Sequence, residues 1–79
     1  MSHVPHELPE AFPDKIDVMH ELRASDAHFS RLSDQYHVIN REIHRAETDV
    51  EPMSDFYLED MKKRRLALLD EIAAIINRA

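Results

Sequence analysis

Residues 29–50 read FSRLSDQYHVINREIHRAETDV, and apolar side chains recur in this stretch at alternating steps of three and four residues. The repeat consists of Phe29, Leu32, Tyr36, Ile39, Ile43, Ala46 and Val50. This spacing aligns them in one stripe along an α-helix. A second apolar repeat follows Pro52. Two striped segments joined by a short break with a proline predict an all-α fold, an antiparallel, coiled-coil-like hairpin whose helices cover each other's stripe.

The second long helix is expected over residues 54–77. Ser54 is a favourable N-cap, because its hydroxyl can accept a hydrogen bond from an otherwise unpaired backbone N–H of the first turn. Met53 and Leu58 occupy the two positions of a hydrophobic staple across this cap. The connector near residues 48–53 is short enough to force the two helices into antiparallel packing.

The N-terminal part of the chain is less regular. Pro5 and Pro9 break any continuous helical period, so we expect an irregular arm over residues 1–12. A short helix is predicted over residues 13–24. Residues 13–79 would then form a single helical hairpin domain, to which this short helix is an N-terminal extension.

The junction between the short helix and the first long helix can be interpreted in two ways. Ser25 interrupts the apolar repeat, and Ser25-Asp26 resembles an N-cap followed by a first-turn acid. The chain then breaks here and a long helix covers residues 26–48. Alternatively, one helix runs straight through with a polar residue in its seam. We favour the break.

Composition narrows the possible classes of protein. The 79 residues include no Gly, which disfavours sheet-rich folds and phosphate-binding loops. The lack of Cys excludes disulfides and thiolate zinc sites and fits a reducing cytoplasm, where we expect the protein to act. No apolar run approaches the roughly 18 residues of a membrane span, and the N-terminus has no secretory pattern. The net charge of −6 disfavours nucleic acid and anionic membranes as partners.

No metal, cofactor or catalytic residue is expected. Among the six histidines, His37 and His44 share a helix face but lie about 10.5 Å apart along the axis, too far to ligate one zinc ion. Ser25, Asp26 and His28 have the composition of a catalytic triad, yet side chains within one helical turn splay apart and cannot form its linear chain of hydrogen bonds. We therefore expect neither enzymatic activity nor a small-molecule substrate.

The last helix carries more apolar surface than a two-helix hairpin needs. One seam consists of Leu58, Met61, Leu68, Ile72 and Ile75, and a second lies beside it, with Leu66, Leu69, Ala73 and Ile76. Leu66, Leu69 and Ile76 would lie in water in an isolated hairpin, which soluble monomers rarely tolerate. We expect them to form an interaction surface, most simply in a homodimeric four-helix bundle, or else with a protein client. The alternative is a three-helix monomer in which the 13–24 helix covers this seam.

Two further groups are candidate contacts. Phe56 and Tyr57 are adjacent aromatic residues near the connector, and at least one of them should be partly exposed. We favour packing against Val50 and Met53 at the tip of the hairpin over contact with a partner. The run Lys62, Lys63, Arg64, Arg65 could contact nucleic acid. Four consecutive helical residues point all around the axis, however, and this favours a solvated face with ion pairs from Glu59 to Lys63 and from Asp60 to Arg64. Arg65 is expected to reach a carboxylate across the hairpin.

Two stretches resemble the YdcH-like family of small bacterial proteins of undefined function. They are DAHFSRL at residues 26–32 and MKKRRLALLDEI at residues 61–72. The resemblance implies a cytoplasmic bacterial helical hairpin and supplies no catalytic residues. The chain departs from the family pattern at Met61, Arg65 and Leu69, the last of which widens the apolar face. We therefore predict a helical protein-interaction or structural module; the alternative is a nucleic-acid- or ribosome-associated accessory protein that uses residues 62–65.

Overall fold

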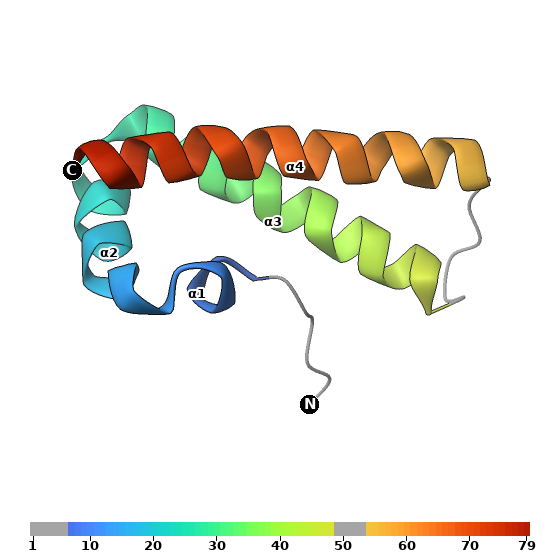
Figure 1. Cartoon of the computed structure of the whole chain (residues 1–79), viewed down its shortest axis with the longest axis horizontal. Helices are drawn as coiled ribbons and strands as arrows, with labels where there is room; N and C mark the ends of the chain where they lie inside the picture. The colour runs from blue at the N-terminus through green and yellow to red at the C-terminus, as the bar shows by residue number, and fades with distance from the viewer. Residues whose placement is uncertain (1–6, 49–53) are drawn as a thin grey trace.

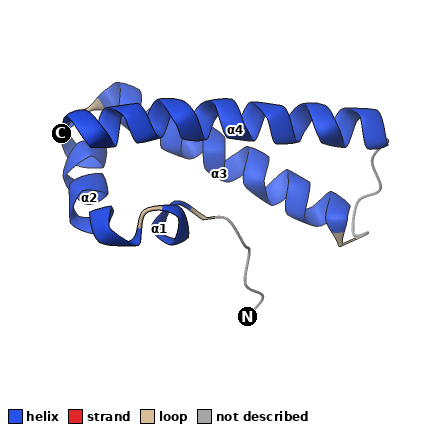
Figure 2. Ribbon diagram, viewed as in Figure 1, coloured by secondary structure: helices blue, strands red, loops and turns tan. Residues whose placement is uncertain are grey.

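The computed structural model describes residues 7–48 and 54–79, which form helices and short joints, with no strand in either range (Figures 1 and 2). The elements are α1 (Leu8–Ala11), a 3-10 turn (Pro13–Lys15), α2 (Ile16–Ser25), α3 (Ala27–Glu47) and α4 (Asp55–Arg78). The long helices α3 and α4 run antiparallel and pack against each other, with α2 across one end of the pair. The predicted all-α hairpin with a short N-terminal helix is confirmed.

The break between α2 and α3 is also confirmed, but the cap lies one residue further along than predicted. Asp26 has an extended backbone, and its carboxylate Oδ1 accepts hydrogen bonds from the backbone N–H groups of His28 at 3.0 Å and Phe29 at 3.1 Å. Ser25 is the last residue of α2, where its hydroxyl donates to the Glu21 carbonyl at 2.8 Å. An anionic oxygen that satisfies two helix N–H groups and faces the positive end of the dipole is the stronger cap.

The predicted irregular arm is corrected over its described part. Residues 8–11 form one α-helical turn, α1, with Pro9 in its first turn, where a missing N–H leaves no hydrogen bond unmade. Leu8 and Phe12 pack against the core from this segment. Apolar burial therefore orders a stretch whose prolines alone suggest irregularity. Residues 1–6 lie outside the described part of the chain.

The start of α4 agrees with the sequence pattern. Ser54 is its N-cap, and the serine Oγ accepts a hydrogen bond from the Tyr57 backbone N–H at 3.2 Å. Met53 and most of the predicted connector lie outside the described residues, so the staple with Leu58 stays a prediction. None of the described helices is long and apolar enough to cross a membrane.

The core joins α2 to the hairpin. Its buried side chains come from three helices: Met19, Phe29, Leu32, Tyr36, Ile72, Ile75 and Ile76. Partly buried residues surround them, among them Leu22, Leu68 and Leu69. Ile76, predicted to lie on an exposed seam, is only 2% exposed, and of the three seam residues Leu66 alone is well exposed, at 59%. Within one chain, α2 therefore covers the part of this seam around Ile76, because it contributes Met19 to the cluster that buries Ile76, while Leu66 stays exposed.

Candidate interaction surface

An apolar groove of about 610 Å³ runs between α3 and α4 on the face of the hairpin beside the core. Half of its lining residues are apolar and half are charged or polar: Val38, Ile39, Ala67 and Leu68 in the first group, Asp34, Gln35, Arg64 and Glu71 in the second. Val38 is 55% exposed, although its neighbour Ile39 is half-buried. The groove therefore leaves aliphatic surface in contact with water.

Helical spacing explains how these residues come together. On α3, residues 38 and 39 lie three and four residues after residue 35, and on α4, residues 67 and 68 lie three or four residues from both 64 and 71, so each set shares one helix face. Ala67 has a side chain too small to fill the space between the helices. A shallow groove results, and a side chain from another molecule could enter it.

The sequence pattern did not identify this groove as a site. Val38 lies outside the 3-4 stripe of α3, and Leu68 was assigned to the seam that faces α3. The sequence contained one indication of exposed apolar surface. Val38 is aliphatic but lies outside the apolar stripe of α3, next to the stripe residue Ile39. An exposed aliphatic residue next to a small Ala on the opposing helix can be recognised as part of a groove only when the pairing of the two helices is known.

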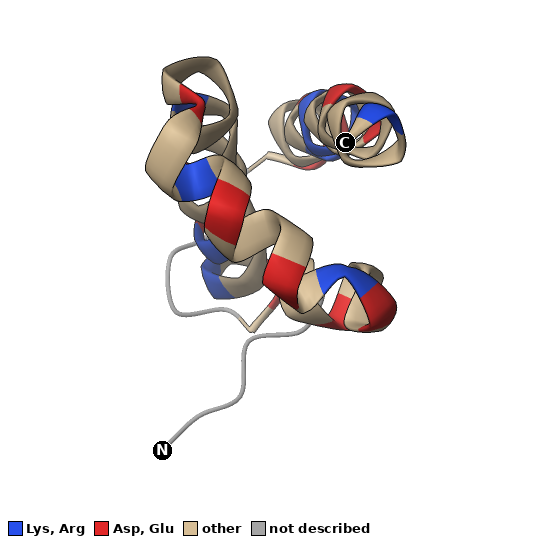
Figure 3. Cartoon of the chain, turned by 90° about the vertical axis from the view of Figure 1, so that its left-hand side faces the viewer, with Lys and Arg blue, Asp and Glu red and all other residues tan. Residues whose placement is uncertain are grey.

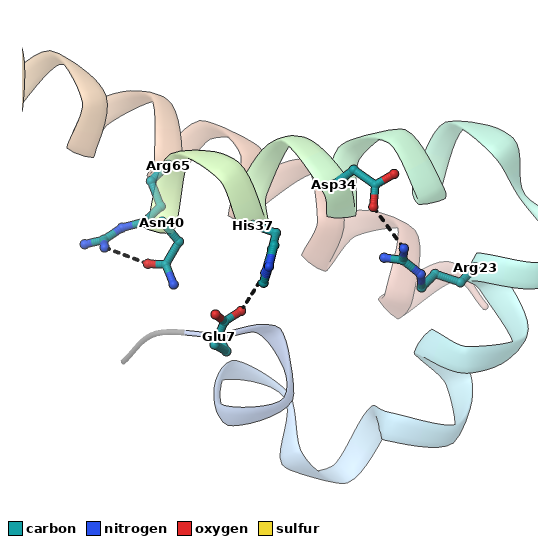
Figure 4. Close-up of polar contacts among 6 residues, drawn as sticks. All are labelled: Glu7, Arg23, Asp34, His37, Asn40 and Arg65. Atoms are coloured by element: carbon teal, nitrogen blue, oxygen red, sulfur yellow. Dashed lines mark hydrogen bonds and ion pairs between the residues drawn. The ribbon is translucent and has the colours of Figure 1, made fainter. Parts of the chain in front are cut away.

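A polar contact between α3 and α4 lies within the hairpin. Arg65 donates from Nη1 to the side-chain oxygen of Asn40 at 3.0 Å (Figure 4). Asn40 is only 1% exposed. The prediction that Arg65 reaches across the hairpin is confirmed, but its acceptor is a neutral amide and not a carboxylate. A shifted register would break this hydrogen bond and take the amide acceptor away from a partly buried guanidinium, so the contact favours the observed register of the two helices.

Tyr36 lies one turn before Asn40 on α3 and is also buried. Burial raises the pKa of the Tyr36 phenol above its usual value of 10.0, because the phenolate would lose its hydration. The nearby Arg65 guanidinium lowers this pKa, and Glu7 raises it, by smaller amounts. Tyr36 is therefore a neutral core residue at physiological pH.

Three residues of the basic run, Lys62, Arg64 and Arg65, contact other side chains of the same chain. Lys62 pairs with Glu47 across the hairpin at 3.2 Å and more loosely with Glu59 at 3.7 Å. Arg64 pairs with Asp60 at 3.1 Å, as predicted. Glu59 thus contacts Lys62 and not the predicted Lys63. In the end-on view of Figure 3, basic and acidic segments are interleaved around α4. This arrangement does not form a continuous positive face.

The candidate aromatic residues lie at the other end of α4 from the core. Phe56 is 88% exposed and Tyr57 48% exposed, in the first turn of the helix. Both are therefore available for contact. The residues of the connector that could pack against them, Val50 and Met53, lie outside the described residues.

The histidines of the described residues do not gather into a metal site. His37 lies on the exposed side of α3, and its Nδ1 is 3.2 Å from a carboxylate oxygen of Glu7. Within residues 7–48 and 54–79, no group of three or more His, Cys, Asp or Glu residues has the arrangement of a metal site. His3 and His6 belong to the segment outside this description. Asp26, one member of the triad-like composition, serves as the cap of α3.

Comparison with known proteins places most of the hairpin in one family. A family model with the description "Protein of unknown function (DUF465)" matches residues 29–76. The match begins at Phe29 and ends at Ile76, so it contains the whole groove and omits α1 and α2. No curated protein and no solved structure is significantly similar to the chain.

Proposed function

We propose that this chain, which belongs to the DUF465 family of proteins of unknown function, is a helical interaction module that pairs with a second copy of itself through the α3–α4 groove. The single observation that carries the proposal is the exposed apolar groove around Val38. We further infer that the protein is a cytoplasmic, non-enzymatic member of the YdcH-like group of bacterial hairpins. Its role would then be to present or assemble helices, not to transform a substrate.

The apolar surface of the groove favours a helical partner. Val38, Ile39 and Leu68 supply aliphatic contact, and Ala67 allows another backbone to come close. Two hairpins joined along this face would form a four-helix bundle, which removes the exposed Val38 from water. Burying aliphatic side chains stabilises an association by roughly 25 cal/mol for each Å² removed from water, before the entropic costs of association.

The charges beside the groove favour a second copy over an unrelated helix. Arg64 and Glu71 are seven residues apart and so lie on one face of α4, with Ala67 and Leu68 midway between them. A two-fold axis through this midpoint makes the two α4 helices antiparallel. Each Arg64 then lies opposite Glu71 of the other copy. The surface is self-complementary, as a symmetric dimer interface requires.

Sedimentation equilibrium at tens of micromolar tests the dimer. The unmodified chain should have twice the monomer mass, and Val38→Glu should convert it to a monomer because a carboxylate would be buried among the apolar residues of the interface. Leu66→Glu is the matched control, since Leu66 is equally exposed but does not line the groove. A monomeric unmodified chain would contradict the proposal. A dimer that Leu66→Glu dissociates and Val38→Glu does not would place the interface on the opposite flank of α4.

Charge reversal tests the two-fold arrangement separately. Arg64→Glu and Glu71→Arg should each weaken the dimer, because like charges then face each other across the axis. The double variant should restore it. If the double variant dimerises no more tightly than the single variants, the two-fold axis does not pass near Ala67. The alternative of nucleic-acid binding by residues 62–65 predicts something different, a complex with RNA whose affinity falls steeply with salt.

A further inference from the structure

A column of four exposed side chains runs along nearly the whole of α4. Its members are Tyr57, Arg64, Glu71 and Arg78, which follow one another at intervals of seven residues. Seven residues make about two helical turns, so the four side chains lie on one side of the helix. The two inner members, Arg64 and Glu71, line the groove. The column therefore continues the face of the proposed dimer toward both ends of α4.

The two outer members of the column are exposed. Tyr57 is 48% exposed in the first turn of α4, and Arg78 is exposed at its last residue. Among residues 7–48 and 54–79, no ion pair or side-chain hydrogen bond involves the Tyr57 phenol or the Arg78 guanidinium. The two residues are 21 positions apart on one straight helix (Figure 1), which is about 32 Å. Contact between these two side chains can therefore form only between two copies of the chain.

The two-fold axis of the proposed dimer brings the two residues together, so this step rests on the function proposed above. That axis passes midway between Arg64 and Glu71. Because the column is evenly spaced, the same point is midway between Tyr57 and Arg78. In an antiparallel pair of α4 helices, Tyr57 of each copy then lies opposite Arg78 of the other. Helices that cross at about 20° are displaced sideways by about 5–6 Å at this distance from the axis, which a long arginine side chain can span.

We propose that the Arg78 guanidinium of each copy packs on the Tyr57 ring of the other. A guanidinium stacks on an aromatic face and is attracted by the negative charge of the π system. The charges near Tyr57 have the sign that this contact requires, because Asp55, Glu59 and Asp60 in the first two turns of α4 attract a cation.

The two contacts make the interface selective for a second copy. They form at opposite ends of α4, and a shift of one helix by a turn would break both while it moved Arg64 away from Glu71. A helix of another protein could fill the groove with apolar side chains. It would satisfy the whole column only if it carried an arginine and an aromatic residue at the same spacing.

Sedimentation equilibrium of the full chain measures the contact as a change in the dimer Kd. Tyr57→Leu and Arg78→Gln each remove the contact at both ends, so each should raise the Kd about five- to thirtyfold. The double variant should be about as weak as either single variant, because both substitutions remove the same contact. Phe56→Leu and Lys63→Gln are the matched controls on exposed residues of α4 outside the column, and each should change the Kd by less than about twofold.

Crosslinking tests the arrangement without relying on the strength of the contact. The chain has no cysteine, so Tyr57→Cys and Arg78→Cys each introduce a unique thiol. When the two variants are mixed in equal amounts, a short bismaleimide reagent should join position 57 of one chain to position 78 of the other. This product should exceed both the 57–57 and the 78–78 products. A predominance of either symmetric product would overturn the antiparallel contact.

The outcomes separate this contact from the dimer itself. A monomeric unmodified chain would contradict both. A chain that dimerises and is dissociated by Val38→Glu, but whose Kd is unchanged by Tyr57→Leu and Arg78→Gln, would overturn the contact and leave the groove as the interface. Losses that add in the double variant would also overturn it, since they would show that Tyr57 and Arg78 act independently.

Discussion

The two ends of the hairpin are built differently. At the closed end, the first half of α3 and the last half of α4 meet α2, and large apolar side chains from all three helices form one buried cluster. At the open end, toward the connector, only α3 and α4 meet, and their buried apolar residues Ile43 and Met61 lie outside that cluster. Asn40 and Arg65 lie between the two ends.

This difference shows what a third helix contributes. Two helices bury only the stripe that faces the partner, so side chains on their flanks stay in water. At the closed end α2 covers one flank, which allows Ile75 and Ile76, adjacent in sequence, both to be buried. At the open end the adjacent Phe56 and Tyr57 stay exposed. Stability should therefore be concentrated at the closed end, and surfaces available for contact should lie elsewhere.

Truncation of one buried isoleucine at each end tests this comparison most strongly. Ile72 and Ile43 are both 0% exposed, at the closed and open ends respectively. Ile72→Ala should lower the free energy of unfolding by about 4 kcal/mol, and Ile43→Ala by about 2 kcal/mol, because two helices can close around a cavity more easily than three. Urea denaturation measures both. Equal losses would show that the open end is packed as tightly as the closed end.

Removing the Asn40–Arg65 contact, which lies midway between the two ends, should have the next largest effect on the free energy of unfolding. Asn40→Ala removes the acceptor of Arg65 and should cost about 1–3 kcal/mol, because a partly buried guanidinium is left without it. Arg41→Ala, at an exposed neighbouring position, should change stability by less than about 0.5 kcal/mol. A double-mutant cycle with Arg65→Met isolates the pair. A coupling energy near zero would mean that the contact does not set the register.

Each end of the hairpin has one described helix N-cap, and removing either cap should lower stability by a smaller amount. Asp26→Ala removes the acceptor of two backbone N–H groups at the closed end and should cost about 1–2 kcal/mol, whereas Ser54→Ala removes the acceptor of one and should cost about 1 kcal/mol. Ser25→Ala is the control, with a loss below about 0.5 kcal/mol. Thermal denaturation ranks the three variants. A larger loss for Ser25→Ala than for Asp26→Ala would move the cap back to Ser25.

The smallest expected effect is on the stability of the fold at alkaline pH. Because burial raises the pKa of Tyr36 in the folded chain, the folded state holds this proton more tightly than the unfolded state does. Its contribution to stability is complete below pH 10 and is lost as the pH rises above that value. Tyr36→Phe should show a shallower loss above pH 10 than the unmodified chain. Tyr57→Phe, which alters an exposed phenol, should follow the unmodified chain, and identical slopes for all three would contradict a buried, neutral Tyr36.

Much of the helical framework could be predicted from local sequence. The stripe from Phe29 to Ile43 and the cap at Ser54 depend on side-chain spacing and on hydrogen bonds within one turn, both of which are local properties. The cap at Asp26 was missed by one residue, because Ser25 and Asp26 are both good capping residues and only the backbone conformation decides between them. The turn at α1 was missed because its order depends on the distant core that Leu8 and Phe12 contact.

The sequence by itself determined that the chain forms two long amphipathic helices in a hairpin, since periodicity and a short connector leave few other arrangements. Only the tertiary structure decided which apolar residues stay exposed. Ile76 and Leu66 belong to the same sequence seam, yet α2 reaches the end of α4 where Ile76 lies and leaves Leu66 in water. The groove around Val38 arises in the same way, because it forms between two helices and depends on how their flanks meet.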